Sequence, residues 1–111
     1  ELAVAVAART DAMRSVGVDI EPALPLPADL RAVVAAPQDR LGDLDPGMGG
    51  RILFAVKEAA YKASFPLDGR VLGFEDIAVD FEAGEAVTSS GRRLMVRFTV
   101  TPKILALSYP A

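Results

Sequence analysis

Residues 51–64 read RILFAVKEAAYKAS, and this stretch decides the fold. At about 100° per residue, its aliphatic residues and alanines fall on one broad stripe of a helix, namely Ile52, Leu53, Val56, Ala59, Ala60 and Ala63. The stripe predicts a helix over residues 50–64, and the small alanines predict close packing against a sheet. Glu58 lies on the opposite side with Phe54 and Tyr61. Two aromatic residues beside an acid indicate that this second face is covered as well.

The first twenty residues predict a β-hairpin. Residues 2–8 (LAVAVAA) are apolar on both faces, which is typical of a buried strand. Residues 9–14 contain charged and turn-forming side chains, and they are expected to return the chain into a second strand over residues 16–20. We therefore expect the two strands to lie side by side.

Two short helices and a break are expected between the hairpin and the long helix. Pro27 opens the first helix, which extends through Val34. A second short helical stretch is expected over residues 37–44. Residues 45–50 (DPGMGG) are rich in glycine and predict a flexible break before the long helix.

The remainder of the chain predicts strands. Alternating apolar and polar residues occur over residues 76–82, 94–100 and 105–109, with turns between them. Strands, then helices, then strands indicate an α+β fold in which an antiparallel sheet packs against one long helix and short helices. The length of 111 residues is that of a single domain, residues 1–111.

The composition excludes several classes of protein. With 51% hydrophobic residues the chain can form a core, but its longest apolar run, residues 2–8, is far shorter than the roughly 20 residues of a membrane span. No cysteine or histidine is present, which removes disulfides, thiolate nucleophiles and His-ligated metals. A net charge of −3 argues against nucleic-acid binding. No signal peptide is indicated, so a cytoplasmic location is expected. The first residue is glutamate, which suggests a piece of a longer protein.

Residues 16–21 (VGVDIE) place two acids on one face of a strand. Asp19 and Glu21 are two residues apart, so their side chains point the same way, whereas Ile20 between them is expected to face the core. Like charges at this separation repel each other. We expect either a nearby cation or exposure of both acids to water.

Glu58 on the long helix is a candidate for a third carboxylate at the same place. Three carboxylates with water in the remaining positions describe a site for a hard cation and favour Mg²⁺. Lys57 and Lys62 are positioned along the helix to meet phosphates as point charges. The alternative is a strand end in water and an ordinary surface pair between Glu58 and Lys62.

The two motifs together resemble the signature of the 4'-phosphopantetheinyl transferase superfamily. That signature has an apolar-Gly-apolar-Asp segment, here in residues 16–21. Some tens of residues later it has an aromatic residue, two variable positions, Lys-Glu-Ala, two further positions and Lys, here in residues 54–63 (FAVKEAAYKA). Residues 37–41 (PQDRL) are similar to the intervening T-x-x-E-R-x-x-L segment, with Asp39 in place of glutamate. Residues 65–74 are similar to a segment of the larger subfamily.

The resemblance is to the larger, pseudo-dimeric members of the enterobactin- and surfactin-synthetase-activating type. These have two similar halves with coenzyme A bound between them, and this chain is similar to the C-terminal half. The resemblance implies that residues 1–111 form one half of the pseudo-dimeric fold. It also implies that an N-terminal half, which contains a Ser-His segment and several coenzyme A contacts, is missing.

The resemblance also implies an activity and roles for individual residues. The reaction is Mg²⁺-dependent transfer of the 4'-phosphopantetheine arm of coenzyme A to a carrier-protein serine, with release of adenosine 3',5'-bisphosphate. Asp19, Glu21 and Glu58 are implied as Mg²⁺ ligands and Glu58 also as the base for the serine. Lys57 and Lys62 are implied as phosphate-binding residues, with Lys62 stabilising the leaving group. The implied partners are acyl, peptidyl or aryl carrier proteins of siderophore, polyketide and nonribosomal-peptide synthases.

Two other functions stay open from the sequence. One is a non-catalytic half-domain that needs its N-terminal half, and the other is a Mg²⁺-dependent phosphohydrolase that uses the same carboxylates. Asp39 has two interpretations, a residue that helps to activate the serine or an acid at a helix start. Arg92, Arg93 and Arg97 form a small basic patch that either meets an acidic carrier protein or is a solvated strand face.

Overall fold

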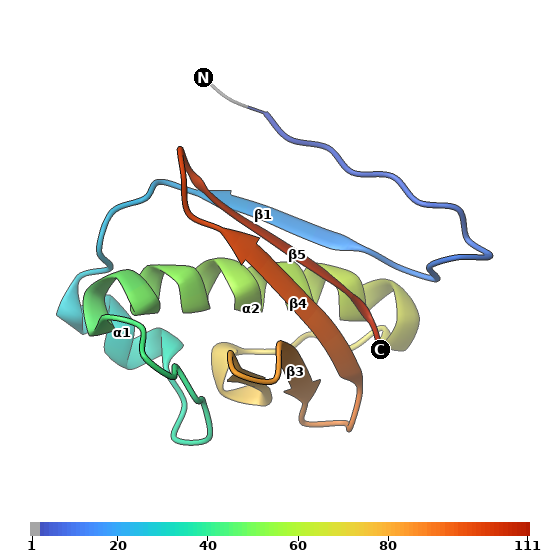
Figure 1. Cartoon of the computed structure of the whole chain (residues 1–111). Coiled ribbons are helices and arrows are strands. Elements are labelled where there is room, and N and C mark those ends of the chain that lie inside the picture. The colour runs from blue at the N-terminus through green and yellow to red at the C-terminus, as the bar shows by residue number, and fades with distance from the viewer. Residues whose placement is uncertain (1–2) are drawn as a thin grey trace.

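A computed structural model describes residues 3–111, which form a five-stranded antiparallel sheet with one long helix across it (Figure 1). The predicted α+β fold is confirmed. The strand order is β1-β5-β4-β3-β2, so the first strand pairs with the last and the other strands form a meander. The elements along the chain are β1 (Gly17–Glu21), α1 (Ala28–Val34), α2 (Pro46–Asp68), the 3-10 turn η1 (Phe74–Asp76), β2 (Ile77–Asp80), β3 (Glu85–Thr88), β4 (Arg93–Thr99) and β5 (Ile104–Pro110).

Helix α2 is longer at both ends than the sequence predicts. The Asp45 carboxylate accepts a hydrogen bond from Met48 N (3.0 Å), and Pro46 occupies the first turn, where its missing N–H costs nothing. The predicted flexible break at residues 45–50 is therefore wrong, because these residues form the cap and first turn. Gly50 lies within the helix, and the position favours glycine because a Cβ there would lie 2.7 Å from Arg31 Cγ. Gly69, with φ of 65°, ends the helix.

The predicted apolar stripe of α2 forms the core. Its six residues are at most 1% exposed, and they pack on the helix-facing side of the sheet. The sheet contributes buried apolar residues there, namely Ile77, Val79, Ala86, Leu94, Val96, Ile104 and Ala106. Full burial of an aliphatic side chain contributes roughly 1.5–3 kcal/mol, so this layer is a major source of stability.

Strand β1 presents a different face to α2 than the sequence predicts. A Cβ placed on Gly17 would lie 2.7 Å from Ala63 N and closer still to Ala59 O, so the strand meets the helix backbone at this glycine. Since side chains alternate along a strand, Asp19 and Glu21 also face α2. The expectation that Ile20 faces the core is wrong. Ile20 is half-buried on the opposite face of the sheet.

The predicted N-terminal hairpin does not form. Leu2 lies outside the described residues, and residues 3–8 are exposed and are not part of a strand. Only the turn is present, where the backbone N–H groups of Ala12 and Met13 donate to Arg9 O. Figure 1 shows residues 3–8 as an extended segment that runs apart from the sheet. A strand that is apolar on both faces needs cover on both, and residues 3–111 do not provide it here.

Residues 37–44 form turns instead of the predicted helix. Arg40 makes an isolated parallel bridge to Asp80 beside the edge of β2, with Arg40 N donating to Val79 O and Phe81 N donating to Arg40 O. These hydrogen bonds require an extended backbone at Arg40, which a helix would not allow. Among the described residues, no helix is long and apolar enough to cross a membrane.

Replacement of Gly17 by alanine tests the close approach of β1 to α2. Because the new methyl group meets helix backbone atoms that cannot rotate away, we expect Gly17→Ala to lower the free energy of unfolding by about 1–3 kcal/mol or more. Urea denaturation followed by circular dichroism measures this loss. Gly69→Ala is the control, since no atom lies within 4 Å of its added Cβ and it incurs only the left-handed backbone cost of about 1–2 kcal/mol. A smaller loss for Gly17→Ala than for Gly69→Ala would contradict the close approach.

Candidate functional site

The two acids of β1 each meet a cation from α2. Lys62 Nζ donates to Asp19 Oδ1 at 3.0 Å and also to Val18 O at 3.0 Å. Arg51 Nη1 lies 3.3 Å from Glu21 Oε1. The sequence predicted that Asp19 and Glu21 share one face, and the structure confirms it. Of the two alternatives for their surroundings, a nearby cation or exposure to water, the structure shows the cation.

Lys62 and Arg51 do not fully compensate the two acids, either in charge or in hydrogen bonds. Burial raises the pKa of Glu21, and the negative charge of Asp19 raises it further, while Arg51 partly offsets both effects. The second carboxylate oxygen of Asp19, Oδ2, is buried and has no hydrogen-bond partner among the described residues. An unpaired buried acceptor beside a like charge is a position that favours an additional cation.

Glu58 lies on the same stripe of α2 as the two cations. Arg51, Glu58 and Lys62 are seven and four residues apart, so they fall within about 40° of one another around the helix. Glu58 is therefore placed between the residues that contact Glu21 and Asp19. Within residues 3–111, however, no three carboxylates are grouped closely enough to hold a metal ion. The structure brings Asp19 and Glu21 together and leaves Glu58 apart from them.

A cavity of about 270 Å³ adjoins Glu58. It lies between α2 and the segment that follows the helix, and its lining includes Tyr61, Leu72 and Phe74. The rings of Phe54 and Phe74 have centroids 5.7 Å apart. Phe54, Glu58 and Tyr61 are half-buried, so this second face of α2 is covered in part, and within the described residues Leu72 and Phe74 lie against it.

Lys57 is buried in a polar network rather than at the surface. Its ammonium group donates to Val34 O and to Phe74 O, both at 2.9 Å, and lies 2.8 Å from Asp39 Oδ2. An ammonium group has three donors, and all three have partners here. Lys57 therefore does not lie where a phosphate contact was expected. Burial lowers the pKa of Lys57, and Asp39 partly opposes this effect.

Asp39 is the acid that holds this network together, and the sequence did not predict this role. Besides Lys57, its carboxylate accepts hydrogen bonds from Ala36 N and Val79 N, each at 2.8 Å. It thus joins the turn before α2 to strand β2. One sequence signal could have indicated the pair, namely a lysine beside the buried stripe of the helix, which requires an acid partner.

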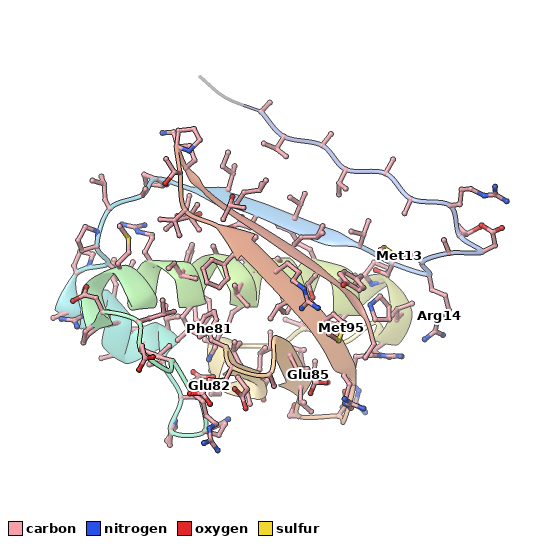
Figure 2. The ribbon with its side chains drawn as sticks, in the orientation of Figure 1. Met13, Arg14, Phe81, Glu82, Glu85 and Met95 are labelled. Carbon is pink, nitrogen blue, oxygen red and sulfur yellow. The ribbon has the colours of Figure 1, made fainter. Side chains whose placement is uncertain are left out.

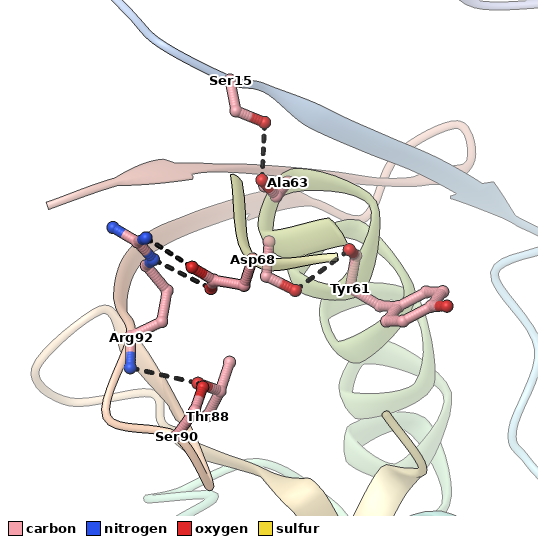
Figure 3. Close-up of polar contacts among 8 residues, drawn as sticks. Ser15, Tyr61, Ala63, Asp68, Thr88, Ser90 and Arg92 are labelled. Atoms are coloured by element: carbon pink, nitrogen blue, oxygen red, sulfur yellow. Dashed lines mark hydrogen bonds and ion pairs between the residues drawn. The ribbon is translucent and has the colours of Figure 1, made fainter. Parts of the chain in front are cut away.

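A second polar cluster lies at the C-terminal end of α2 (Figure 3). Arg92 binds Asp68 with two hydrogen bonds, from Nε at 3.0 Å and from Nη2 at 2.5 Å, and this contact lowers the pKa of Asp68. The backbone N–H of Arg92 donates to Thr88 Oγ1 at 3.1 Å. Ser15 Oγ donates to Ala63 O at 2.5 Å, which connects the start of β1 to the same helix end.

Together, the fold and the site define an α+β protein whose edge strand presents two carboxylates to a lysine-bearing helix. The family model described as the 4'-phosphopantetheinyl transferase superfamily matches residues 15–103. The chain belongs to this superfamily. The matched range contains all of the predicted site residues.

Three curated relatives are similar to the chain over about 70% of its length. The 4'-phosphopantetheinyl transferase PptT of Mycobacterium tuberculosis is 47% identical over 83 residues, which cover 70% of this chain and 36% of the relative. Npt of Nocardia iowensis is 41% identical over 81 residues, covering 70% and 36%. Svp of Streptomyces mobaraensis is 41% identical over 88 residues, covering 72% and 35%. The chain thus matches about a third of the length of these relatives.

Removal of the Lys57 ammonium group tests the buried network. Lys57→Ala leaves Asp39 charged and buried without its partner, so we expect a loss of about 3–5 kcal/mol in the free energy of unfolding. Urea denaturation measures the loss. Lys103→Ala is the matched control at an exposed position, and its effect should stay within about 0.5 kcal/mol. A loss equal to that of the control would show that Lys57 is not held by the network.

The raised pKa of Glu21 predicts a pH dependence of stability. Above its ordinary value of 4.5, the folded state keeps a proton on Glu21 that the unfolded state has released. Stability therefore declines as the pH rises from 4.5 through the folded-state pKa. We expect the difference in unfolding free energy between the unaltered protein and Glu21→Gln to decline across this window. Denaturation curves at a series of pH values measure it, and a difference that grows with pH would contradict the raised pKa.

Proposed function

We propose that the chain is the C-terminal, catalytic half of a 4'-phosphopantetheinyl transferase. In this proposal the whole protein transfers the phosphopantetheine arm of coenzyme A to a carrier-protein serine and releases adenosine 3',5'-bisphosphate. The main support is the arrangement of Asp19 and Glu21 opposite Lys62, within the range that matches the superfamily. The names of the three relatives support the same activity.

The acid pair fits a divalent metal ion. Asp19 Oδ2 is an unpaired buried acceptor, and Glu21 is a second hard oxygen ligand beside it. Mg²⁺ is often held by one or two carboxylates together with substrate phosphates, so a cage of three protein ligands is not required. Asp19 and Glu21 would hold the ion, with Glu58 as the third candidate. When bound, Mg²⁺ neutralises charge on the pyrophosphate of coenzyme A.

Lys62 and Glu58 have separate roles in the proposed transfer. The Lys62 side chain is 48% exposed beside Asp19, so its ammonium group is accessible to a phosphate oxygen of the leaving group. The serine oxygen bonds to the phosphorus that carries the pantetheine arm, and the bond from that phosphorus to the adenosine bisphosphate breaks. Glu58 accepts the serine proton, directly or through a water molecule. Lys57 is not included because all of its donors already have partners.

An N-terminal half is proposed to complete the coenzyme A site. The chain matches about a third of the length of its relatives. The sheet face opposite α2 also bears apolar residues, among them Ile20, Leu105 and Leu107, which are only half-buried among the described residues. Apolar residues on both faces of a strand are typical of a sheet that is covered on both sides.

A cytoplasmic location and a role in siderophore or other secondary-metabolite synthesis stay predictions.

A transfer assay tests the proposed activity. The protein in its natural length is mixed with coenzyme A, Mg²⁺ and an apo carrier protein, and mass spectrometry follows the added phosphopantetheine arm. We expect Glu58→Gln to lower the rate by about 10²–10⁴-fold through loss of the base. Asp19→Asn should also lower it strongly, because a metal ligand is lost. Asp43→Asn changes an exposed acid outside the site and should leave the rate unchanged.

The same assay separates the competing functions. Transfer by the protein of natural length that does not depend on Asp19 or Glu58 would favour the non-catalytic half-domain, because the catalytic groups would then lie in the other half. Release of pantetheine phosphate from coenzyme A without a carrier protein would favour the phosphohydrolase. Full activity of both Asp19→Asn and Glu58→Gln would overturn the assignment of the site.

A further inference from the structure

Four arginines from three separate segments lie at the C-terminal end of α2. Arg70 follows the helix, Arg92 and Arg93 come from the start of β4, and these three line an open cavity of about 660 Å³ together with Asp68. Arg14 lies beside a second cavity that shares Ala111 with the first. Figure 2 shows Arg14 at the end of the sheet, near the last turn of α2. We call these four residues the arginine surface.

The arginine surface differs from the basic patch that the sequence predicted. Arg97 is not part of it, because Arg97 lies beside a different cavity with Phe81 and Glu82, where its Nη1 donates to Gly84 O and Val96 O. Arg14 and Arg70 take its place, although they lie far from Arg92 in the sequence. The three-dimensional fold, and not the run of arginines on one strand, assembles the positive charge.

The arginine surface has more positive than negative charge. Asp68 pairs with Arg92, and Glu85 pairs with Arg93 at 2.6 Å. Within residues 3–111, Arg14 and Arg70 have no acidic partner. Two positive charges therefore stay uncompensated on a chain whose net charge is −3. The pKa of Asp68 is held low by its hydrogen bond from Arg92, with smaller effects of Arg70 and Arg14, which agrees with a positive local field.

Exposed apolar residues adjoin the arginine surface. Val71, which follows Arg70 directly, is 82% exposed, and Phe65 on the last turns of α2 is 44% exposed. Apolar residues bordered by arginine are typical of protein interfaces, where arginine is enriched and lysine depleted. This combination favours a protein partner over a small anion. The cavity is also open, and no unpaired buried donor points into it from the described residues.

The arginine surface is continuous with the proposed site. Arg70 lines the large cavity, and the next residues, Val71 and Leu72, line the cavity beside Glu58. Along α2, Glu58 and Asp68 are ten residues apart, which corresponds to about 15 Å. A small domain is about 30 Å across, so a partner that contacts the arginine surface can also reach Glu58.

We propose that the arginine surface docks an acidic, partly apolar face of the carrier-protein domain that receives the phosphopantetheine arm. This inference rests on the proposed function. The two uncompensated arginines attract the acidic face, and Val71 contacts its apolar residues. The attraction accelerates encounter and orients the carrier protein so that its serine faces Glu58.

Charge reversal tests the docking surface in the protein of natural length. Arg14→Glu/Arg70→Glu is compared with the unaltered protein for kcat, for KM of the carrier protein and for KM of coenzyme A. We expect KM of the carrier protein to rise at least about tenfold, because like charges then face each other. The KM of coenzyme A and kcat should change by less than about twofold, since the altered residues do not contact the reacting atoms. Circular dichroism verifies that the variant is folded.

Two further variants make the result specific. Arg40→Glu/Lys103→Glu changes the net charge equally at exposed positions outside the surface and should leave all three constants unchanged. Arg14→Gln/Arg70→Gln removes charge without adding repulsion and should give an intermediate rise. A rise in the KM of coenzyme A alone would show a small-anion site and overturn the proposal. An equal effect of both charge-reversal variants would also overturn it, because it would show unspecific electrostatics.

Fluorescence anisotropy of a labelled apo carrier protein separates the docking surface from the proposed activity. If the unaltered protein binds the carrier protein and the arginine variant does not, docking is supported even where no transfer occurs, and only the proposed function fails. Binding should weaken as salt is added to the unaltered protein. Absence of binding by the unaltered protein overturns the docking surface.

Discussion

The close approach of β1 to α2 at Gly17 is the constraint on which the candidate site depends. No side chain fits between the strand and the helix backbone at this position, so Gly17 must face the helix. Alternation along the strand then places Asp19 and Glu21 on the same side. A strand turned the other way would present Ile20 to the helix and point both acids away from it. One missing side chain thus determines that the carboxylates meet Arg51 and Lys62.

The buried pair of Lys57 and Asp39 fixes the walls of the neighbouring cavity. The Lys57 ammonium group binds the backbone of Val34 at the end of α1 and of Phe74 at the start of η1. Asp39 binds the backbone of β2 through Val79. The end of α1, the start of η1 and strand β2 are therefore held against α2 by charged hydrogen bonds, which are stronger than neutral ones. The cavity beside Glu58 depends on the position of these segments.

Periodicity predicted the long helix and four of the five strands, missed β3 (Glu85–Thr88), and predicted the ends and faces of the elements poorly. The long helix and the strand at VGVDIE follow from spacing alone, and both are present. The start of α2 was missed because glycines that suggest flexibility are required there for close packing, as at Gly50. The absence of a strand at residues 3–8 has a different cause. Apolar residues on both faces of a strand become buried only where other parts of the protein cover both faces. The local sequence does not show whether such a covering surface is present.

Helix geometry determines where the two lysines of the FAVKEAAYKA motif point. Lys57 and Lys62 are five residues apart, so their side chains point about 140° apart around the helix. They cannot both reach one phosphate unless one side chain folds back across the helix. The structure resolves this conflict by directing Lys57 into the protein toward Asp39 and Lys62 toward Asp19 at the edge of the sheet. Within one motif, one lysine therefore stabilises the fold, and the other stays available for the proposed phosphate contact.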